Sequence, residues 1–468
     1  MRSKALLLAA ALAGCASGEA PTRPDLGPLA AEARFAAAGE RAVAAWWRAF
    51  GDADLEALVV RALRENPDLA VAAARVREAR ATVQALDADL LPRLDAQLAL
   101  ASRRISNQTG QNFPGLPRRS DVGSAGIQLS WEIDLWGRAA DRAQAALADA
   151  ESTAFRAAAA EVALAASVTR AWFAVRLARE DLVCLRGDFA SRLADMDLVA
   201  RRSQAGLVDD DALAAARLAA AQAKAAELDA SRRLAAAENA LRVLVALAPG
   251  ATLPGSLPAE SGEPAVARQP DFGPGLPSDL LLARPDLRAA ARALDASLAR
   301  EGAARADFYP RLLLVGDAGW AADPASNLGR SGSGFWNLTP SLTLPVFEGA
   351  RNAAGLEAAR SRVDLAAAEW RQAVLGAFRE VDDALVDLRD IATQEDLARR
   401  VLDAVASRLA NAESRLKAGL ADRLEVEAAR RDLLLARRTF AGYAWERRQA
   451  AVRLAAATGG GFPFPNGK

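Results

Sequence analysis

Four stretches of the chain alternate apolar and polar residues with a period of two, which is typical of β-strands with one apolar face. The alternation is regular in residues 93–100, 127–136 and 336–346. It is less regular in 311–320, where three leucines follow one another. Each stretch is close to ten residues long, the length that a tilted strand needs to cross a bilayer.

Each pair of predicted strands follows a helical segment that ends at a proline. The two segments begin at the Pro-Asp pairs at Pro67 and Pro285 and continue as alanine- and arginine-rich helix to Pro92 and Pro310. Proline favours the first helical turn but cannot continue a helix, and it disfavours helix at the residue before it. The sequence therefore predicts helix–strand junctions at Pro92 and Pro310.

After each strand pair, apolar residues recur every seven residues, which predicts very long helices at roughly 137–205 and 348–417. At ~1.5 Å per residue, each helix would be about 100 Å long. A seven-residue repeat indicates coiled-coil packing, and Glu395 is its one break in the second helix. We expect the helices to end at Gly206 and Gly419, where glycine is a common helix stop, and to be followed by returning helices.

The chain contains this arrangement twice. The segments that begin at Asn66 and Arg284 match at an offset of 218 residues, and "AGLVDDDALAAAR" at 205–217 matches "AGLADRLEVEAAR" at 418–430 at an offset of 213. Two copies with so long a period indicate a duplicated half.

The pattern predicts the following organisation: a signal peptide at 1–14, a lipidated N-terminus and tether at 15–39, a first repeat at 40–247 (strands about 92–102 and 125–136, long hairpin 137–247), a linker at 248–283, a second repeat at 284–458 (strands about 310–320 and 335–347, long hairpin 348–458) and a tail at 459–468.

The N-terminus has the features of an export signal. Arg2 and Lys4 precede a short apolar run that ends in "LAGC" at Cys15. This ending resembles the bacterial lipobox, which implies cleavage before Cys15 and a covalent lipid on that residue. An ordinary signal peptide with an incidental cysteine is the alternative. In such lipoproteins an aspartate after the cysteine favours inner-membrane retention, and the alanine at position 16 resembles the outer-membrane type.

Composition narrows the possible functions. The formal net charge is zero, so nothing indicates binding to nucleic acid. Histidine is absent and there are two cysteines, Cys15 and Cys184, which cannot form a four-ligand zinc site or a disulfide framework. We therefore predict no enzyme activity, no catalytic residues, no metal site and no cofactor other than the lipid on Cys15.

The predicted strands could form soluble hairpins with one buried face or cross a membrane. Aromatic residues gather near the strand ends, as at a membrane interface, and favour the membrane. After the signal no run of about 18 consecutive apolar residues occurs, so we expect strands rather than helices to cross it. Four strands cannot close into a barrel, and an open sheet edge in lipid leaves backbone groups unpaired. Two copies would give eight strands and three would give twelve, and both numbers are compatible with a closed barrel.

The duplicated order of helix, "LPRL" or "YPRL", strands, long helix, "AGL" and returning helix resembles the TolC-like outer-membrane efflux protein family. The lipobox and the segment at 46–69 resemble its lipoprotein branch of OprM- and NodT-type proteins. The resemblance implies a mainly α fold with a small β part, in which a homotrimer forms a 12-stranded outer-membrane β-barrel that continues into a periplasmic α-helical barrel. It also implies a passive exit duct that works with a periplasmic adaptor (membrane fusion protein) and an inner-membrane RND-type transporter.

By the same resemblance, the two "AGL" segments are periplasmic tips that meet the adaptor. The residues implied are Gly206, Leu207, Gly419 and Leu420. Acidic residues six and nine positions after the second tip glycine narrow the pore in some relatives. Glu425 fits the first position, whereas the second is alanine. We expect the nearby aspartates to cap helices instead, because carboxylates are favourable in the first turn of a helix. They are Asp209, Asp210, Asp211 and Asp422.

A lipid-anchored periplasmic coiled-coil adaptor or scaffold is the alternative function. It would share the lipid anchor and the seven-residue repeat, but it would not explain two hairpins of bilayer-length strands. The sequence names neither the cargo nor the partner pump.

Overall fold

The structure is a computed structural model that describes residues 45–106, 119–253 and 284–460. It divides into two compact units, which we call the sheet unit and the hairpin unit. Of the described residues, the sheet unit contains 75–106, 119–154 and 289–371, and the hairpin unit contains 45–74, 155–253, 284–288 and 372–460. Cys15, the tether, most of the linker and the end of the tail lie outside the described residues.

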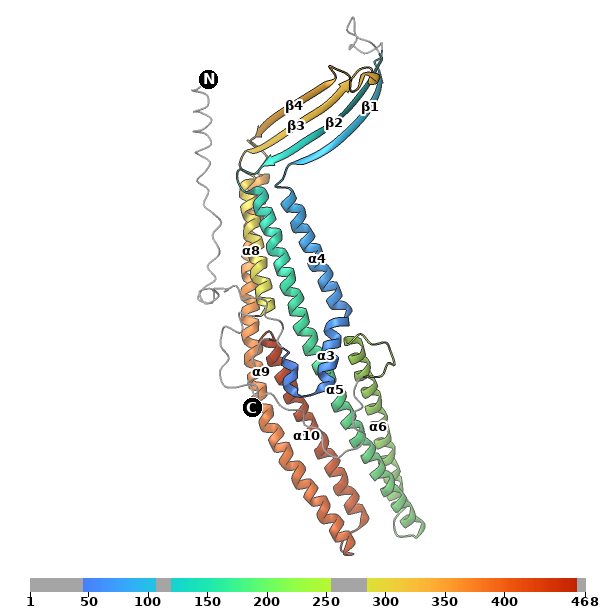
Figure 1. Cartoon of the computed structure of the whole chain (residues 1–468). Coiled ribbons are helices and arrows are strands. Elements are labelled where there is room, and N and C mark those ends of the chain that lie inside the picture. The colour runs from blue at the N-terminus through green and yellow to red at the C-terminus, as the bar shows by residue number, and fades with distance from the viewer. Residues whose placement is uncertain (1–44, 107–118, 254–283, 461–468) are drawn as a thin grey trace. The chain divides into compact units, whose positions relative to one another are not determined.

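The elements follow the duplicated order (Figure 1). In chain order they are η1 (Trp46–Phe50), α3 (Ala53–Glu65), α4 (Pro67–Ala88), β1 (Arg93–Arg104), β2 (Arg119–Ile133), α5 (Arg138–Gln204), α6 (Asp210–Leu244), α8 (Pro285–Ala306), β3 (Arg311–Ala322), η2 (Ala325–Asn327), β4 (Gly334–Thr343), α9 (Arg351–Lys417) and α10 (Arg423–Ala457).

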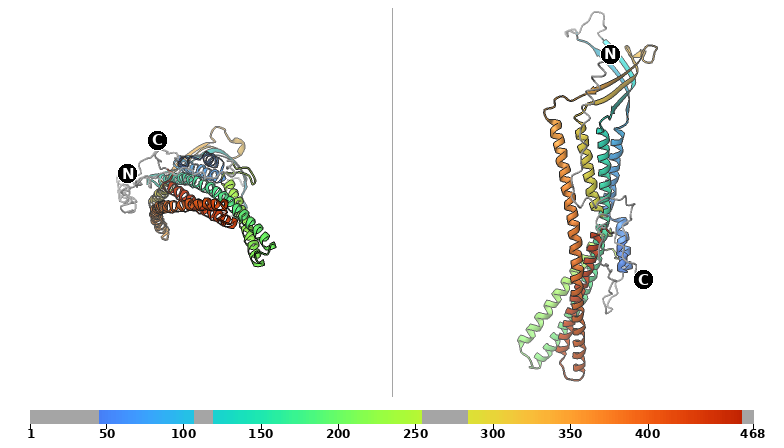
Figure 2. Two further views of the ribbon diagram at one scale, coloured as in Figure 1. Left: turned by 90° about the horizontal axis from the view of Figure 1, so that it is seen from below. Right: turned by 90° about the vertical axis from the view of Figure 1, so that its left-hand side faces the viewer.

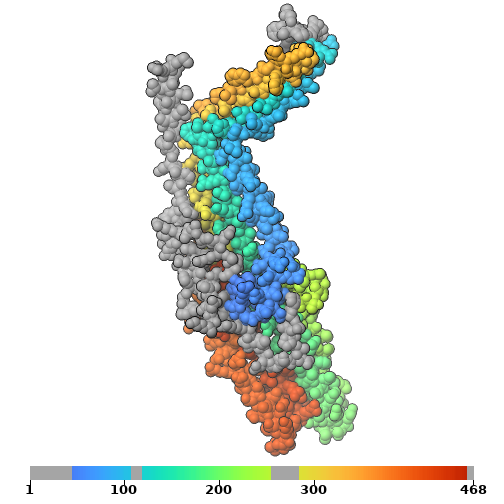
Figure 3. Space-filling view, viewed as in Figure 1, coloured from blue at the N-terminus to red at the C-terminus, as the bar shows by residue number. Residues whose placement is uncertain are grey.

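The sheet unit contains one four-stranded antiparallel sheet in the order β1-β2-β3-β4. The strands form one continuous curved band in the space-filling view (Figure 3). The register places most of the large apolar residues of the four strands on one face, which we call the apolar face, and most of the polar residues of their central parts on the other, the polar face. The apolar face includes Leu94, Leu98, Leu100, Ile127, Leu129, Trp131, Leu312, Leu314, Trp320, Trp336, Leu338 and Leu342.

Two glycines are required where β2 and β3 approach closely on the polar face. Gly126 lies directly opposite Gly319 in the register. A Cβ added to Gly126 would lie 2.7 Å from the carbonyl oxygen of Ala318. Because that atom belongs to the backbone, the strand itself would have to move, and only glycine fits the pair.

The strands of the first pair are longer toward the loop than predicted. β1 continues to Arg104 and β2 begins at Arg119, whereas the sequence predicted strands at about 92–102 and 125–136. The alternation fades there because the apolar-face positions become polar. In the second pair, β4 ends at Thr343, short of the predicted end near 347. The irregular stretch at 311–320 lies in β3, where Leu313 occupies the polar face.

The four helix–strand connections lie at one end of the sheet (Figure 1). Pro92 lies between α4 and β1, and Pro310 lies between α8 and β3. Trp136 stacks on Tyr309 with ring centroids 4.9 Å apart, and its Nε1 donates a hydrogen bond of 2.8 Å to the carbonyl oxygen of Pro310. These two aromatic side chains therefore stabilise the helix–strand junction at Pro310.

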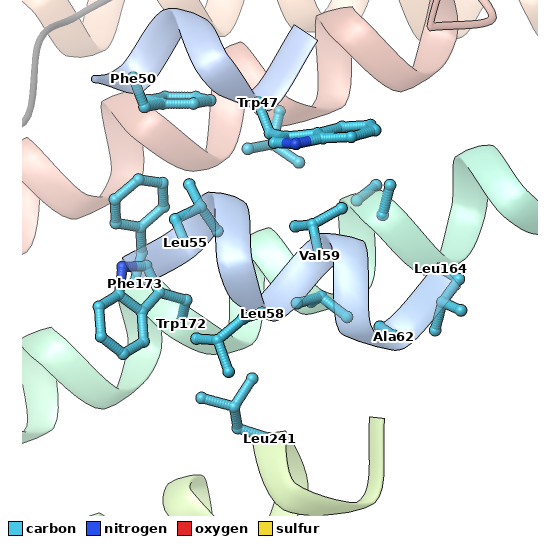
Figure 4. Packing of buried hydrophobic residues seen from close by; sticks show 14 of the residues in the cluster. Trp47, Phe50, Leu55, Leu58, Val59, Ala62, Leu164, Trp172, Phe173 and Leu241 are labelled. Carbon is cyan, nitrogen blue, oxygen red and sulfur yellow. The ribbon is translucent and has the colours of Figure 1, made fainter. Parts of the chain in front are cut away.

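The core of the hairpin unit surrounds α3. Trp46, Phe50 and Leu58 are buried with Trp172 of α5 and Leu241 of α6 (Figure 4). α3 begins at a capping aspartate, and its buried residues share one side of the helix. The short N-terminal helices therefore join helices that are far apart in the sequence.

In the hairpin unit, α5 runs antiparallel to α6, and α9 runs antiparallel to α10 (Figure 2). The predicted apolar stripe of α9 is buried at Ala377, Ala384 and Ala398. Glu395, the break in that stripe, has a side chain only 13% exposed and pairs with Arg447 of α10 at 2.9 Å. The irregular position is thus an ion pair inside the hairpin.

The duplication extends to individual contacts. Asn66, just before α4, donates from Nδ2 to the carbonyl oxygen of Leu244 at 2.9 Å. Arg284, just before α8, donates from Nη1 to the carbonyl oxygen of Ala457 at 2.8 Å. The two donors differ by 218 residues and the two acceptors by 213, the offsets seen in the sequence. Both contacts tie the start of one helix to the end of another.

Among the described residues, one helix, α5, is long enough to cross a membrane and contains an 18-residue window that is apolar enough to do so. Polar residues interrupt this window, so it contains no 18 consecutive apolar residues. Half of the window is buried within the chain, and because the core helix of a soluble protein passes the same test, one such helix is weak evidence for a span.

Candidate functional site

The tip turns of the two helical hairpins have the same backbone geometry. Gly206 and Gly419 adopt φ values of 68° and 72°. Leu207 N–H donates to the carbonyl oxygen of Arg202 at 2.9 Å, and Leu420 N–H donates to that of Arg415 at 2.8 Å. Glycine is favoured at both positions because other residues rarely adopt positive φ.

Apolar side chains project from both turns. Leu207 is 73% exposed and Leu420 is 70% exposed. An exposed leucine is not unusual by itself. Leu207 and Leu420 are nevertheless exposed at equivalent positions of two turns with the same hydrogen bond, and their contact with an adaptor stays a prediction.

Two of the tip aspartates cap helices. Asp209 accepts a hydrogen bond from Ala212 N–H at 2.9 Å at the start of α6. Asp422 accepts from Leu424 N–H at 3.4 Å at the start of α10. Capping is therefore a sufficient reason for an aspartate at both positions.

Asp422 has a second partner that Asp209 lacks. Arg202 of α5 donates from Nη2 to both of its carboxylate oxygens, at 2.9 and 2.7 Å. This hydrogen bond lowers the pKa of Asp422 below its ordinary value of 3.8. The pair connects the first hairpin to the tip of the second.

Glu425 is also paired within the chain. Arg415 of α9 donates from Nη1 to Glu425 Oε1 at 2.5 Å and from Nη2 to the carbonyl oxygen of Leu420 at 3.2 Å. The Glu425 side chain is 44% exposed. The structure thus places this predicted constriction residue at the second tip with an arginine beside it, and its role in a pore stays a prediction.

Arg202 and Arg415 are not among the predicted tip residues. Both arginines precede their tip glycine by four residues and so are equivalent in the two repeats. Their equivalent positions in the two repeats were the only feature of the sequence that could have indicated a role at the tips. The sequence does not show that both side chains bind acidic groups of the second tip.

Further ion pairs join α5 to α10. Arg431 Nη1 donates to Asp195 Oδ2 at 2.5 Å, and Arg438 Nε donates to Asp181 Oδ1 at 2.5 Å. Between these pairs, Gly187 of α5 faces the side chain of Leu434, which a Cβ would approach to 3.0 Å. The two hairpins are therefore closely packed, and ion pairs at several positions along α5 and α10 hold them together.

Cys184 has no sign of reactivity. It is 1% exposed, and burial raises the pKa of its thiol to about 12. Within the part of the chain that the structure describes, no group of three or more histidine, cysteine, aspartate or glutamate residues could hold a metal ion.

Comparison with known proteins agrees with this geometry. Residues 58–247 and 276–460 match the model of the outer membrane efflux protein family. The chain is 33% identical to the outer membrane protein OprJ of Pseudomonas aeruginosa, over 98% of this chain and 95% of that protein. It is 30% identical to the probable outer membrane lipoprotein SilC of Salmonella typhimurium, over 89% of this chain and 88% of that protein.

Solved structures of two similar proteins have the same fold as this chain. A crystal structure of CusC is 29% identical, covers 89% of this chain and 94% of its own chain, and superposes with a TM-score of 0.76. A crystal structure of a membrane protein from Pseudomonas aeruginosa is 32% identical, covers 88% and 91%, and has a TM-score of 0.78. The two segments that match the family model together cover most of this chain, which therefore belongs to the outer membrane efflux protein family.

Proposed function

We propose that this efflux protein acts as a homotrimer whose sheets join into a 12-stranded outer-membrane barrel, a passive exit duct for small molecules. The observation that carries the proposal is the four-stranded sheet, which has one continuous apolar face and unpaired outer edges on β1 and β4. In lipid those edges need strand partners, and further copies of the same sheet can supply them.

Barrel size favours three copies over two. An eight-stranded barrel has an interior just wide enough for its own side chains, whereas larger barrels enclose a channel. The polar face carries Gln97, Gln128, Asn337 and Thr339, which suit contact with water in such a channel. A trimer therefore fits an export function better than a dimer.

We assign the hairpin tips to the periplasmic entrance, where a tripartite pump would place its adaptor. Leu207 and Leu420 would make apolar contacts with a membrane fusion protein that links this chain to an inner-membrane RND-type transporter. One similar protein is a cation efflux system protein and another a toluene efflux pump outer membrane protein, so the names of similar proteins do not agree on a cargo.

The proposal is tested with the purified full chain in detergent and in planar bilayers. We expect a trimeric mass by native mass spectrometry, heat-dependent migration on gels and stable ion conductance in bilayers. A monomeric protein that leaves the membrane when position 15 is changed from cysteine to alanine would instead support the periplasmic scaffold.

A thiol count tests lipidation of Cys15, which we propose because of its lipobox-like context. A thiol reagent such as DTNB is expected to find no reactive thiol in the native protein, since Cys184 is buried with a raised pKa. After denaturation it should find one thiol, because a thioether-linked lipid removes that of Cys15. Two thiols in the denatured protein would contradict lipidation, and Cys184→Ala should lower either count by one.

The Arg202–Asp422 pair is expected to help keep the two hairpins together at the entrance. Asp422→Asn retains a capping side chain but weakens this pair, so conductance through bilayers should rise. An exposed ion pair shifts an equilibrium by no more than about fivefold, which sets the upper limit of the rise. The matched control is Asp209→Asn, which changes the equivalent cap that has no Arg202 contact; an equal rise in both variants would contradict the role of the pair.

The pair also predicts how the entrance responds to acid. Because the pKa of Asp422 is lowered, its contribution is present above the ordinary pKa of aspartate and is lost as the pH falls through the lowered value. Conductance should therefore be constant between about pH 5 and 8 and rise only in stronger acid. Asp422→Asn should abolish that acid-induced rise.

We further propose that three Glu425 side chains form an acidic ring at the entrance. The motivation is the position of Glu425 after the second tip glycine and its 44% exposure. Glu425→Ala should weaken block of the channel by divalent or trivalent cations added from the tip side. Unchanged conductance and unchanged block would remove the ring from the proposal.

A further inference from the structure

The apolar face of the sheet becomes basic toward the β1–β2 loop. Along β1 this face presents Leu98 and Leu100 and then Ser102 and Arg104. The register places Arg104 directly opposite Arg119 of β2. Two guanidinium groups therefore lie on the same face as the apolar band, four residues beyond its last leucine.

This pair of like charges is unusual in a sheet. Like charges directly opposite each other on neighbouring strands are destabilising. Arg119 is 73% exposed and pairs with Asp121 at 3.3 Å, and Asp121 also accepts a hydrogen bond from Ser102. Arg104 is exposed and forms no ion pair with the residues that the structure describes. An external anion between the guanidinium groups would relieve the repulsion.

The two ends of the sheet differ in charge. In the described residues at the loop end (101–106, 119–124 and 320–335) there are four arginines and two aspartates, a net charge of +2. At the helix end (89–95, 130–138, 306–313 and 341–351) there are six acidic and four basic residues, a net charge of −2. The excess of positive charge is thus confined to the loop end.

Two exposed tryptophans of the apolar face lie near the loop ends of β3 and β4. Trp320 is 52% exposed and Trp336 is 80% exposed, and both lie on that face in the register. Exposed tryptophans of membrane proteins concentrate at the lipid–water interface. Arg104 lies on the same face beyond the row of Trp320, and four residues past Leu100 correspond to about 13 Å along a strand.

We infer that Arg104 and Arg119 bind phosphate groups of the glycolipid of the outer leaflet, lipopolysaccharide. The inference rests on the proposed function, which places the loop end of the sheet outside the cell. Arginine suits this role because its planar guanidinium matches phosphate with two parallel hydrogen bonds. The thick sugar-phosphate headgroup of this glycolipid extends beyond the apolar band, where the arginines lie.

The test measures binding of diphosphoryl lipid A to the full-length protein in detergent, by native mass spectrometry. A basic residue near an anionic lipid surface contributes about fivefold in affinity, so Arg104→Gln with Arg119→Gln should weaken binding about 25-fold. Each single variant should weaken it about fivefold. The matched control is Arg103→Gln, which removes an adjacent exposed arginine that lies on the polar face.

The inference that Arg104 and Arg119 bind lipopolysaccharide can be overturned by several results. Unchanged binding in the double variant, or an equal loss in Arg103→Gln, would overturn the inference. Equal binding of lipid A from which both phosphates have been removed would overturn it as well. Displacement of lipid A by inorganic phosphate at equal concentration would show a general anion site rather than a glycolipid site. Bilayer conductance of the wild-type protein tests the proposed duct separately, so either idea can fail alone.

Discussion

Replacing Leu338 with arginine is expected to prevent stable insertion of the protein into the outer membrane. Leu338 lies within β4, is 54% exposed and belongs to the apolar face. A lipid-facing arginine near the middle of a membrane barrel costs about 2–4 kcal/mol, and a trimer would incur that cost three times. The total approaches the stability of a typical folded domain, so the loss of membrane-inserted trimer should be nearly complete.

The matched control for this experiment is Thr339→Arg. Thr339 is the next residue of the same strand, is also exposed, and lies on the polar face. If that face lines a water-filled channel, its arginine stays hydrated and the trimer should persist. The readouts are the amount of protein in the urea-washed outer-membrane fraction and heat-dependent migration on gels. Equal loss for both variants would contradict the assignment of the two faces.

The sequence predicted the strands wherever their two faces differ in polarity. Residues 127–133 alternate without exception, and they lie in β2. The start of β2 at Arg119 was not predicted, because the first residues of β2 on the apolar face, Arg119 and Asp121, are as polar as the residues on the other face. Where both faces contact water, hydrogen-bonded pairing rather than amphipathicity holds the strands, and periodicity carries no signal.

The candidate site could be predicted only in part for a related reason. Gly206 and Gly419 are local signals, since a glycine with positive φ commonly ends a helix. The partner of Arg202 lies 220 residues further along the chain and is reached only after both hairpins fold. Nothing in the sequence near Arg202 distinguishes it from the many other arginines on long helices. Duplication indicates equivalent positions, but it does not indicate which partner each one has.

Replacing Asp52 with alanine is expected to have the largest effect in the hairpin unit. The Asp52 carboxylate caps α3 by accepting from the backbone N–H groups of Asp54 and Leu55, each at 3.1 Å. It also accepts from Trp172 Nε1 and from Arg176 Nη1, each at 2.9 Å. The Asp52 side chain is 11% exposed, so these four hydrogen bonds lie mostly out of contact with water.

Alanine at position 52 removes the acceptor of all four bonds at once. Trp172 is 1% exposed and would keep a buried N–H group without this partner. Removing one member of a largely buried ion pair costs about 3–5 kcal/mol. Asp52→Asn should cost less, because an amide oxygen can still cap α3 although the charge opposite Arg176 is lost. The expected order of stability is therefore wild type, then Asp52→Asn, then Asp52→Ala.

Hydrogen exchange of the α3 amides measures this loss directly, since it reports the free energy of local opening. We expect protection of Leu55 to Ala62 to fall by about two to four orders of magnitude in Asp52→Ala. Asp209→Ala is the matched control: it removes a capping aspartate that has no such contacts with a neighbouring helix, so its effect should be about tenfold and confined to the start of α6. If Asp52→Ala lowered protection no more than this control, Asp52 would be only a cap. A loss that reached the part of α5 around Trp172 would show that this carboxylate connects the N-terminal helices to the long hairpin.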